Sequence, residues 1–246
     1  MNGDAVKELA TRFRGPHEVG TDFVAMPNDW QLIDTDAAIK PGPSAAKLVV
    51  SSLGAVRDYL TANRDELVLD RVVVHVASPS VVRVYGPLAE RARNREQFLE
   101  ASCTDLADEF LGRFMALEAF IVGLQVRFAD ANDRHRLLSL LSNVKHETVK
   151  TAIDDGVTQV VQARAGVALI SDVAVPNPVL LVPYRTFRDV VQPESLFVVR
   201  VNQGKVNGLP EVGLFEADGG AWKLTAMARI KDWLAAALPA DVSVLA

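Results

Sequence analysis

One helical stripe in the middle of the chain constrains the fold more than any other feature. Five large apolar side chains follow the spacing i, i+3, i+4, i+7, i+11, which is the spacing of a single helix face: Leu117, Phe120, Ile121, Leu124 and Phe128. Such a face has to be buried against a core or a partner. Strand-like segments precede and follow this helix, so the sequence predicts an α+β fold.

Two valine-rich runs precede the stripe and predict a β-hairpin. Residues 71–77 and 81–85 are rich in β-branched side chains, and the Ser-Pro-Ser segment between them is typical of a turn. Val82 and Val84 alternate with polar side chains, so we expect one face of this strand to meet solvent. Further strand-like segments, separated by glycine, proline and asparagine, lie at residues 157–168, 179–183, 196–201 and 212–215.

Helices are predicted in four further segments. Apolar spacing and end signals place them at residues 4–14, 51–63, about 130–156 and 221–238. The last helix is expected to bury one stripe, made of Leu224, Met227, Ile230, Trp233 and Leu234. Residues 95–104 are grouped with the helical middle of the chain, although no clear period decides their structure.

The whole chain, residues 1–246, is predicted to form a single α+β domain with mixed sheets, a long central helical region and a C-terminal helix. Prolines and glycines divide residues 1–50, which we expect to form an extended N-terminal arm and loop. A chain of 246 residues can bury a full hydrophobic core, because folding removes roughly 70% of its surface from water.

Composition favours a soluble protein of the cytoplasm. Cys103 is the only cysteine, which excludes an internal disulfide, and its acidic neighbours are expected to raise the pKa of the thiol. No apolar run reaches the roughly 18 residues of a membrane span, and residues 1–4 lack the basic start of a secretory signal. The net charge of −5 argues against a general nucleic-acid binder, although a local basic patch stays open.

Candidate chemical sites are weak. His135 and His146 lie about 16 Å apart on a helix, too far to share one metal ion. The turn at residues 154–156 could supply carboxylates to a cation, but a helix-to-strand turn explains it as well. The turn at residues 216–220 could offer a helix N-terminus to an anion, yet it matches neither phosphate-binding fingerprint. We therefore predict a non-enzymatic protein with no catalytic residue, no metal and no cofactor.

Several segments occur in an order that matches a known family. They are His75-Val-Ala-Ser-Pro79, Glu118-Ala-Phe-Ile121, Asp154-Asp-Gly-Val-Thr-Gln159, Val175-Pro-Asn-Pro-Val179, Pro183-Tyr-Arg-Thr-Phe187, Gln192-Pro193 with Phe197 to Val201, and Phe215-Glu-Ala-Asp-Gly-Gly-Ala-Trp222. Together they resemble the YfdQ-like family of uncharacterised tailed-phage and prophage proteins, over roughly residues 22–240. The resemblance implies a phage-encoded protein made in the host cytoplasm, and it carries over no catalytic residue.

Two hypotheses of function follow. The first is a self-assembling structural or accessory protein, a large symmetric homo-oligomer that forms a closed capsid-like shell or ring and associates with the virion. Its element order is similar to that of capsid proteins of the HK97 type. The alternative is a phage early protein that captures a nucleotide, a nucleic acid or a host defence factor at residues 216–220 and at a basic cluster of Arg83, Arg91, Arg93 and Arg95. The candidate subunit interface comprises Phe13, Phe23, Trp30, Val82, Val84, Tyr85, Arg91, Arg93 and Arg95.

Overall fold

The computed structural model describes part of the chain in full and part as backbone alone. Side chains and backbone are described for residues 46–88, 94–105, 107–142, 177–202 and 210–246. The secondary structure alone is described for residues 17–18, 24–25, 31–34, 37–39, 143–144, 150–154, 159–165, 168–175 and 203.

The chain divides into two compact units. The first comprises residues 1–47 and 88–95, and the second comprises residues 48–87 and 96–246. The described strands of the first unit form two antiparallel pairs: β1 (His17–Glu18) with β2 (Val24–Ala25), and β3 (Gln31–Asp34) with β4 (Ala37–Ile39). The division falls close to the predicted end of the N-terminal arm at residue 50. One domain over residues 1–246 stays a prediction.

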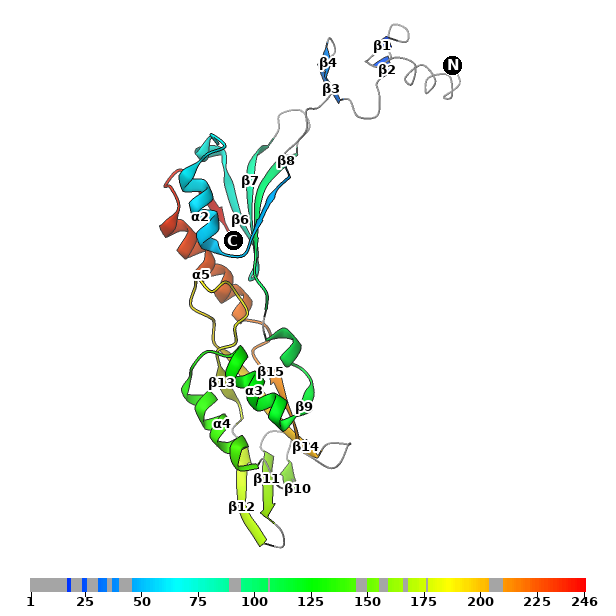
Figure 1. Cartoon of the computed structure of the whole chain (residues 1–246), viewed down its shortest axis with the longest axis vertical. Helices are drawn as coiled ribbons and strands as arrows, with labels where there is room; N and C mark the ends of the chain where they lie inside the picture. Colours follow the sequence, from blue (N-terminus) through cyan, green and yellow to red (C-terminus); the bar gives the residue numbers. More distant parts are fainter. Residues whose placement is uncertain are drawn as a thin grey trace, which may run out of the picture. The chain divides into compact units, whose positions relative to one another are not determined.

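A five-stranded sheet forms one part of the second unit (Figure 1). Its order is β16 (Ser243–Leu245), β6 (Val73–Ser78), β7 (Val81–Leu88), β8 (Arg95–Ser102) and β5 (Leu48–Val50). The hairpin β6–β7 is antiparallel, as predicted, whereas the outer strands β16 and β5 pair in parallel with β6 and β8. Helices α2 (Leu53–Ala62) and α5 (Trp222–Ala237) pack on this sheet, and their apolar faces share one core with its valines.

A four-stranded antiparallel sheet forms another part of the same unit. Its order is β13 (Val179–Leu181), β14 (Ser195–Gln203), β15 (Pro210–Glu216) and β9 (Phe114–Ala116). Helices α3 (Leu117–Arg127) and α4 (Asn132–Val144) share a core with this sheet. Helix α5 follows β15 and leads to β16, so the chain passes from the four-stranded sheet back to the five-stranded one. The fold is therefore α+β, as predicted.

A third sheet is described by its backbone alone. It is the antiparallel meander of β10 (Lys150–Asp154), β11 (Gln159–Ala165) and β12 (Ala168–Val175). Two 3-10 helices complete the described secondary structure, η1 (Leu69–Arg71) and η2 (Asp108–Phe110). Among the described residues, we find no helix that combines the length and the apolar character needed to cross a bilayer.

Helix α2 begins and ends where its sequence signals place it. The Ser52 side chain accepts a hydrogen bond from the Ala55 N–H at 3.3 Å, which satisfies one free donor of the first turn. Asn63 closes the helix in the left-handed conformation, with φ of 40°. A carboxylate from far along the chain completes the N-terminus, because Asp189 accepts from Leu53 N–H and Gly54 N–H at 3.2 and 3.0 Å. The predicted helix at 51–63 is confirmed.

The central stripe is also confirmed, since all five of its side chains are buried. Two neighbouring predictions are wrong, and one further strand has no prediction. Residues 95–102 form strand β8, in which every second side chain toward its end, Leu99 and Ala101, is buried in the core. The helix predicted to reach residue 156 ends at Val144, and β-branched residues of 150–154 pair with β11. Residues 168–175, which had no strand prediction beyond position 168, form β12.

The buried stripe of α5 is shifted from the predicted one. Trp222, Ala226, Ile230 and Leu234 are buried at a four-residue spacing, whereas Leu224 is 75% exposed. The helix is oriented by Trp222, whose indole lies against the buried guanidinium of Arg185 at 3.9 Å. Leu224 follows Trp222 by two residues, which is more than half a helical turn. When Trp222 faces the core, the side chain of Leu224 therefore meets solvent.

Candidate functional site

The buried polar side chains of the described residues gather in one place. They are Arg185, Thr186, Gln192 and Ser195, and we call them the Arg185 cluster. All four lie in the segment between β13 and β14 or at the start of β14. Because burying a polar group costs free energy unless it is hydrogen-bonded, each of these side chains should have a definite role in holding the segment.

Gln192 organises the segment from inside. Its Oε1 accepts hydrogen bonds from Arg185 N–H at 3.0 Å and Thr186 N–H at 3.2 Å. Its Nε2 donates to three backbone carbonyls, those of Thr186, Phe187 and Val190, at 2.9–3.4 Å. Backbone groups in a loop have no helix or strand partners, and here the side chain of Gln192 supplies their hydrogen bonds instead.

The segment is also tied to both sheets. The Thr186 hydroxyl donates to the Pro79 carbonyl in the β6–β7 turn. Arg229 of α5 donates to the carbonyls of Val191 and Gln192 at 3.0 and 2.9 Å. The loop that contains the Arg185 cluster therefore connects the four-stranded sheet to the hairpin and the helix of the five-stranded sheet.

Arg185 is the one charged member of the cluster, and only 1% of it is exposed. Its guanidinium donates to Glu216 at the end of β15 and to the Ser195 hydroxyl, and it stacks on Trp222. Burial lowers the pKa of Arg185, while the hydrogen bond to Glu216 raises it. Arg185 Nε and Trp222 Nε1 are buried without a hydrogen-bond partner within the described part of the chain.

The turn at residues 216–220 lies beside this cation. Asp218 Oδ1 accepts from Gly220 N–H at 3.0 Å, and Gly219 and Gly220 have φ of 62° and 80°. Glycine adopts such angles without the steric cost that a Cβ brings, which explains the Gly-Gly pair before α5. The carboxylate of Glu216 is engaged by Arg185, and that of Asp218 by the backbone of the turn. Both carboxylates therefore stabilise the turn that leads into α5.

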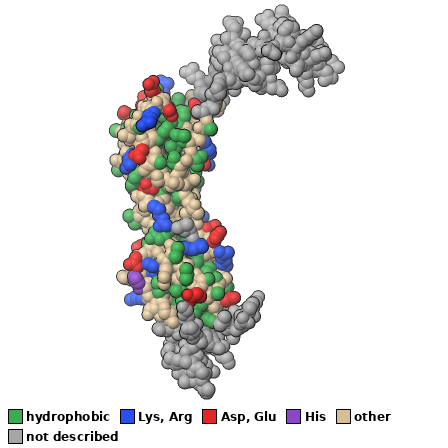
Figure 2. Space-filling model, in the orientation of Figure 1, with side chains coloured by type: hydrophobic (Ala, Val, Ile, Leu, Met, Phe, Trp, Pro, Cys, Tyr) green, Lys and Arg blue, Asp and Glu red, His purple; other side chains and the backbone are tan. Residues whose placement is uncertain are grey.

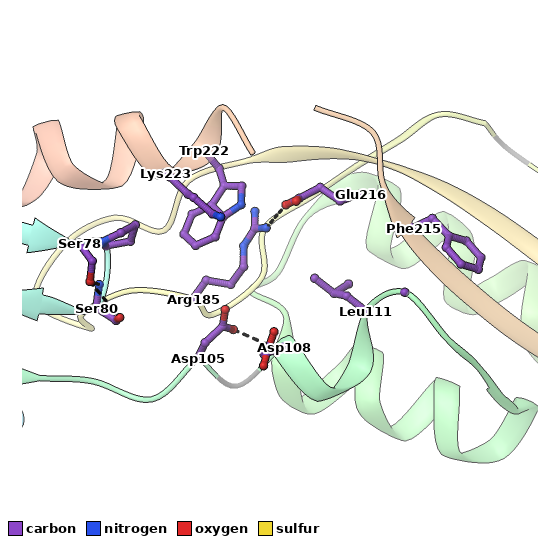
Figure 3. A pocket seen from close by; sticks show the side chains of 12 residues that line it. Ser78, Ser80, Asp105, Asp108, Leu111, Arg185, Phe215, Glu216, Trp222 and Lys223 are labelled. Carbon is purple, nitrogen blue, oxygen red and sulfur yellow. Dashed lines mark hydrogen bonds and ion pairs between the residues drawn. The ribbon is translucent and has the colours of Figure 1, made fainter. Parts of the chain in front are cut away.

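A cleft of about 650 Å³ borders the Arg185 cluster (Figure 3). Arg185, Trp222 and Lys223 line it together with Asp105, Asp108 and Glu216, and the β6–β7 turn contributes Ser78 to Ser80. Asp105 accepts from the N–H groups of Ala107 and Asp108 at 2.9 and 3.1 Å, although burial raises the pKa of its carboxyl. Three carboxylates face two cations here, which disfavours a phosphate ligand.

Cys103 lies close to this cleft, next to the β6–β7 turn. Its N–H donates to the Ser80 carbonyl at 3.0 Å. Burial raises the pKa of the Cys103 thiol to about 11, and Asp105 adds to the effect. The direction agrees with the prediction from the acidic neighbours, but burial is the larger cause.

We expect the folded chain to react with a thiol reagent at pH 8 about 100-fold more slowly than the urea-unfolded chain. The reactive species is the thiolate, whose population at pH 8 falls as the pKa rises. Absorbance of the released aromatic thiolate measures both rates. Equal rates in the two states would show that Cys103 is neither buried nor shifted.

The candidate interface residues from the sequence fall into three groups. Val82 and Val84 are completely buried in the core of the five-stranded sheet, so their prediction as subunit-interface residues is wrong. Tyr85 is half-buried and Arg95 is exposed, which leaves both predictions open. The remaining candidates, Phe13, Phe23, Trp30, Arg91 and Arg93, lie outside the described residues.

Alternation explains the error at Val82 and Val84. A strand that alternates apolar and polar residues turns its apolar side to the core when a helix covers that side, and α2 and α5 do so here. The opposite side carries Arg83, which pairs with Glu100 of β8 at 3.0 Å. Among the arginines of the predicted basic cluster, Arg83 is thus engaged within its own sheet.

A second surface feature was not predicted from the sequence. An apolar groove of about 670 Å³ runs along the outer side of α3, between that helix and residues 109–116. Val122 and Val126 line it and are 51% and 64% exposed. In the view of Figure 2, hydrophobic side chains reach the surface over this part of the four-stranded sheet, with charged side chains around them. We call this feature the α3 groove.

The α3 groove depends on the absence of a side chain at Gly123. A Cβ at this position would lie 2.3 Å from the ring of Phe110, so glycine lets η2 approach the helix closely. The ring of Phe110 then packs against Phe120 and Phe128 with centroid distances of 4.9 and 5.4 Å. The floor of the groove is therefore packed aromatic core, and Val122 and Val126 expose aliphatic surface beside it.

No protein-family model, curated protein or solved structure matches this chain. The family resemblance therefore rests on the sequence segments alone. Several of these segments meet in space: Arg185 and Thr186, Gln192, Glu216 with Trp222, and Pro79 all contribute to the Arg185 cluster or contact it. Their shared location is explained by packing of the connecting loop.

Proposed function

We propose that this chain is a non-enzymatic, phage-encoded structural or accessory protein that assembles with copies of itself. The observation that carries the proposal is the α3 groove, which exposes two valines of a helix whose opposite face is already buried. Contiguous apolar surface of this kind typically marks a contact with another macromolecule. The resemblance to phage proteins supplies the setting.

The outer strands of the described five-stranded sheet support self-association. Strands β16 and β5 are the two outer strands of the five-stranded sheet, and each carries exposed apolar side chains, Leu245 on β16 and Leu48 and Val49 on β5. An outer strand presents unpaired backbone groups to another chain. In a symmetric assembly one modest patch is used many times, so small surfaces of this kind suffice.

The cleft beside Arg185 gives less support to the alternative of nucleotide or nucleic-acid capture. Its acidic side chains outnumber its cations, and the guanidinium of Arg185 is already engaged by Glu216 and Ser195. A phosphate would have to displace Glu216 and approach Asp105 and Asp108. We therefore propose assembly as the function and propose the cleft as a structural junction.

The mass of the full chain in solution tests the proposal. We expect light scattering at micromolar concentration to give a mass of at least twice the 26.7 kDa of one chain. Substitution Val126→Glu places a charge in the α3 groove, and we expect it to weaken self-association by tenfold or more, roughly the effect of burying one unpaired charge at a contact.

The matched control for this prediction is Leu224→Glu, which changes another exposed apolar side chain on a helix, outside the α3 groove. We expect Leu224→Glu to assemble like the unaltered chain. A clean 26.7 kDa monomer for the unaltered chain at micromolar concentration would overturn the proposed function.

A further inference from the structure

We infer that the cleft beside the Arg185 cluster binds a small organic cation, an ammonium or guanidinium group with a hydrogen-bond acceptor such as a carbonyl close to it. The cation lies at Asp105 and Asp108, and the acceptor lies at Trp222. The inference goes beyond the proposed self-assembly and does not depend on it. The loop behind the cleft keeps its structural role, because the ligand enters from the side where Asp108 and Lys223 meet solvent.

The charges that line the cleft favour one additional cation. Its three carboxylates face two cations, and one carboxylate, that of Glu216, is already paired with Arg185. Asp105 and Asp108 form no ion pair with another described residue, which leaves Lys223 as the one lining cation outside the pair. A ligand with one positive charge therefore balances the cleft, whereas an anion adds to its negative excess.

Asp105 is held in position for such a contact. Its Oδ1 accepts the N–H groups of Ala107 and Asp108 at 2.9 and 3.1 Å, so the carboxylate is fixed at the start of η2. Its Oδ2 accepts no hydrogen bond within the described part of the chain. Burial raises the pKa of this carboxyl, and a cation beside Oδ2 offsets the cost of keeping it charged.

Two buried donors in the same cleft call for an acceptor. Arg185 and Trp222 line the cleft and are only 1% and 7% exposed, and among the described residues nothing accepts from Arg185 Nε or Trp222 Nε1. The two side chains are adjacent, because the central guanidinium carbon lies 3.9 Å from the centre of the indole ring (Figure 3). A buried donor without a partner costs free energy, which a ligand's acceptor removes.

Lys223 is the side chain that the ligand displaces. Its Nζ lies over the indole of Trp222, 6.0 Å from the ring centre, and the residue is exposed. Exposed side chains change rotamer within nanoseconds, so Lys223 yields its place at little cost. The ligand's cation then takes over the position opposite the aspartates, and its acceptor approaches the indole from the side that Lys223 leaves.

The size and walls of the cleft suit a ligand of this class. Its volume of about 650 Å³ falls within the range of about 300–1,000 Å³ that is typical of small-molecule sites. Pro79, Leu111 and Phe215 supply apolar wall, on which the aliphatic stem of a basic side chain packs. A basic amino-acid residue combines the cation, the stem and a carbonyl acceptor in one molecule.

Calorimetric titration of the full chain with Nα-acetyl-L-arginine amide tests the inference. The matched control is Nα-acetyl-L-citrulline amide, which has nearly the same shape and the same backbone carbonyls but no charge. We expect saturable binding of the arginine probe and at least about tenfold weaker binding of the citrulline probe, because the charge-assisted hydrogen bonds to carboxylates are lost. Equal affinities, or no saturable binding at about 10 mM of the arginine probe, would overturn the inference.

Two variants of the charged lining move the affinity in opposite directions. Asp108→Asn removes an exposed carboxylate, and we expect it to bind the arginine probe about tenfold more weakly. Its control is Asp70→Asn, which makes the same change at an exposed aspartate of η1. Lys223→Met removes the competing cation, and we expect binding to tighten about threefold, a gain that partial unfolding cannot produce. Unchanged affinity in both Asp108→Asn and Lys223→Met would contradict the proposed site.

Trp222→Phe tests the position of the acceptor, since it keeps an aromatic ring and removes Nε1. We expect the arginine probe to bind about threefold more weakly, whereas Trp233→Phe on the same helix leaves its affinity unchanged. Equal effects of the two variants would overturn the contact with the indole. A capped pentapeptide with one central arginine separates two sources of the cation: tighter binding than the capped single residue supports a basic polypeptide segment, and equal binding supports a free small molecule.

Discussion

Replacing Glu216 by glutamine is expected to lower the free energy of unfolding by about 3 kcal/mol. Glu216 accepts a hydrogen bond from the guanidinium of Arg185, which is 1% exposed. The substitution keeps the size and shape of the side chain but leaves a buried cation without its paired anion. Asp105 and Asp218 also raise the pKa of Arg185, so they compensate part of the loss.

Urea unfolding followed by circular dichroism measures this effect. The matched control is Glu211→Gln, which makes the same change on the same strand, β15, outside the Arg185 cluster. We expect the control to change the free energy of unfolding by less than about 0.5 kcal/mol, as a typical surface substitution does. Similar losses for the two variants would show that the Arg185–Glu216 pair has no special role.

A double-mutant cycle separates the pair from its surroundings. Arg185→Met removes the cation and retains an apolar side chain of similar length, and the remaining Glu216 carboxylate can be hydrated because its side chain is 31% exposed. We therefore expect Glu216→Gln to cost much less in the Arg185→Met background than in the unaltered chain, with a coupling of at least about 1 kcal/mol. Additive losses would contradict a direct interaction.

The elements found correctly from the sequence are those that depend on local periodicity. The stripe from Leu117 to Phe128 and the hairpin around Ser78–Ser80 each fit within a short window of sequence. The error at residues 95–104 concerns a strand that depends on a distant partner: β8 pairs in parallel with β5, which lies about 50 positions earlier. The strand at residues 150–154 pairs with the strand that follows it, β11, so distance does not explain that error. Helical propensity within a window carries no information about the pairing of β8 with β5.

The Arg185 cluster could not be predicted for the same reason. Arg185 and Glu216 lie 31 positions apart, and Thr186 and Pro79 lie 107 positions apart. The sequence showed Arg185 and Gln192 as parts of separate segments of a family resemblance, with no sign that they would meet. Their burial follows from the fold, in which a loop without strand partners obtains hydrogen bonds from side chains instead.

The sequence carries a signal for the α3 groove. Ala119, Val122 and Val126 recur at helical spacing on the side of α3 opposite to the stripe that was recognised. A helix with apolar residues on both sides is buried on both or meets a partner on one. Val122 and Val126 are exposed in this chain, so the second side of α3 is the side that the proposed assembly would cover.

Gln192 is the other position at which one substitution is expected to have a large effect. Gln192→Leu keeps most of the volume and removes five hydrogen bonds to the backbone, two accepted by Oε1 and three donated by Nε2. The buried N–H groups of Arg185 and Thr186 lose these partners. Because each unsatisfied buried group costs about 1–3 kcal/mol, we expect a total loss of about 4 kcal/mol.

The control for Gln192→Leu is Gln97→Leu, which removes the hydrogen bond of a half-buried glutamine to Glu100. We expect this control to cost less than about 1.5 kcal/mol, the usual net value of one hydrogen bond. Both variants are compared with the unaltered chain by urea unfolding. If Gln192→Leu is as mild as the control, the segment between β13 and β14 does not depend on the side chain of Gln192.

A charge variant at the same position separates donor from acceptor. Gln192→Glu retains an oxygen that accepts from Arg185 N–H and Thr186 N–H, but it replaces Nε2 with an oxygen that faces three carbonyls. Burial and those carbonyls disfavour the charged form, so the pKa of the introduced carboxyl is raised in the folded state. Its protonated form regains a donor. The unfolded pKa of this carboxyl is about 4.3. Relative to the unaltered chain, the variant should therefore recover stability as the pH falls from above the raised folded pKa toward about 4.3. It should lose that stability again as the pH rises. A loss that is independent of pH would show that the donated hydrogen bonds do not hold the segment.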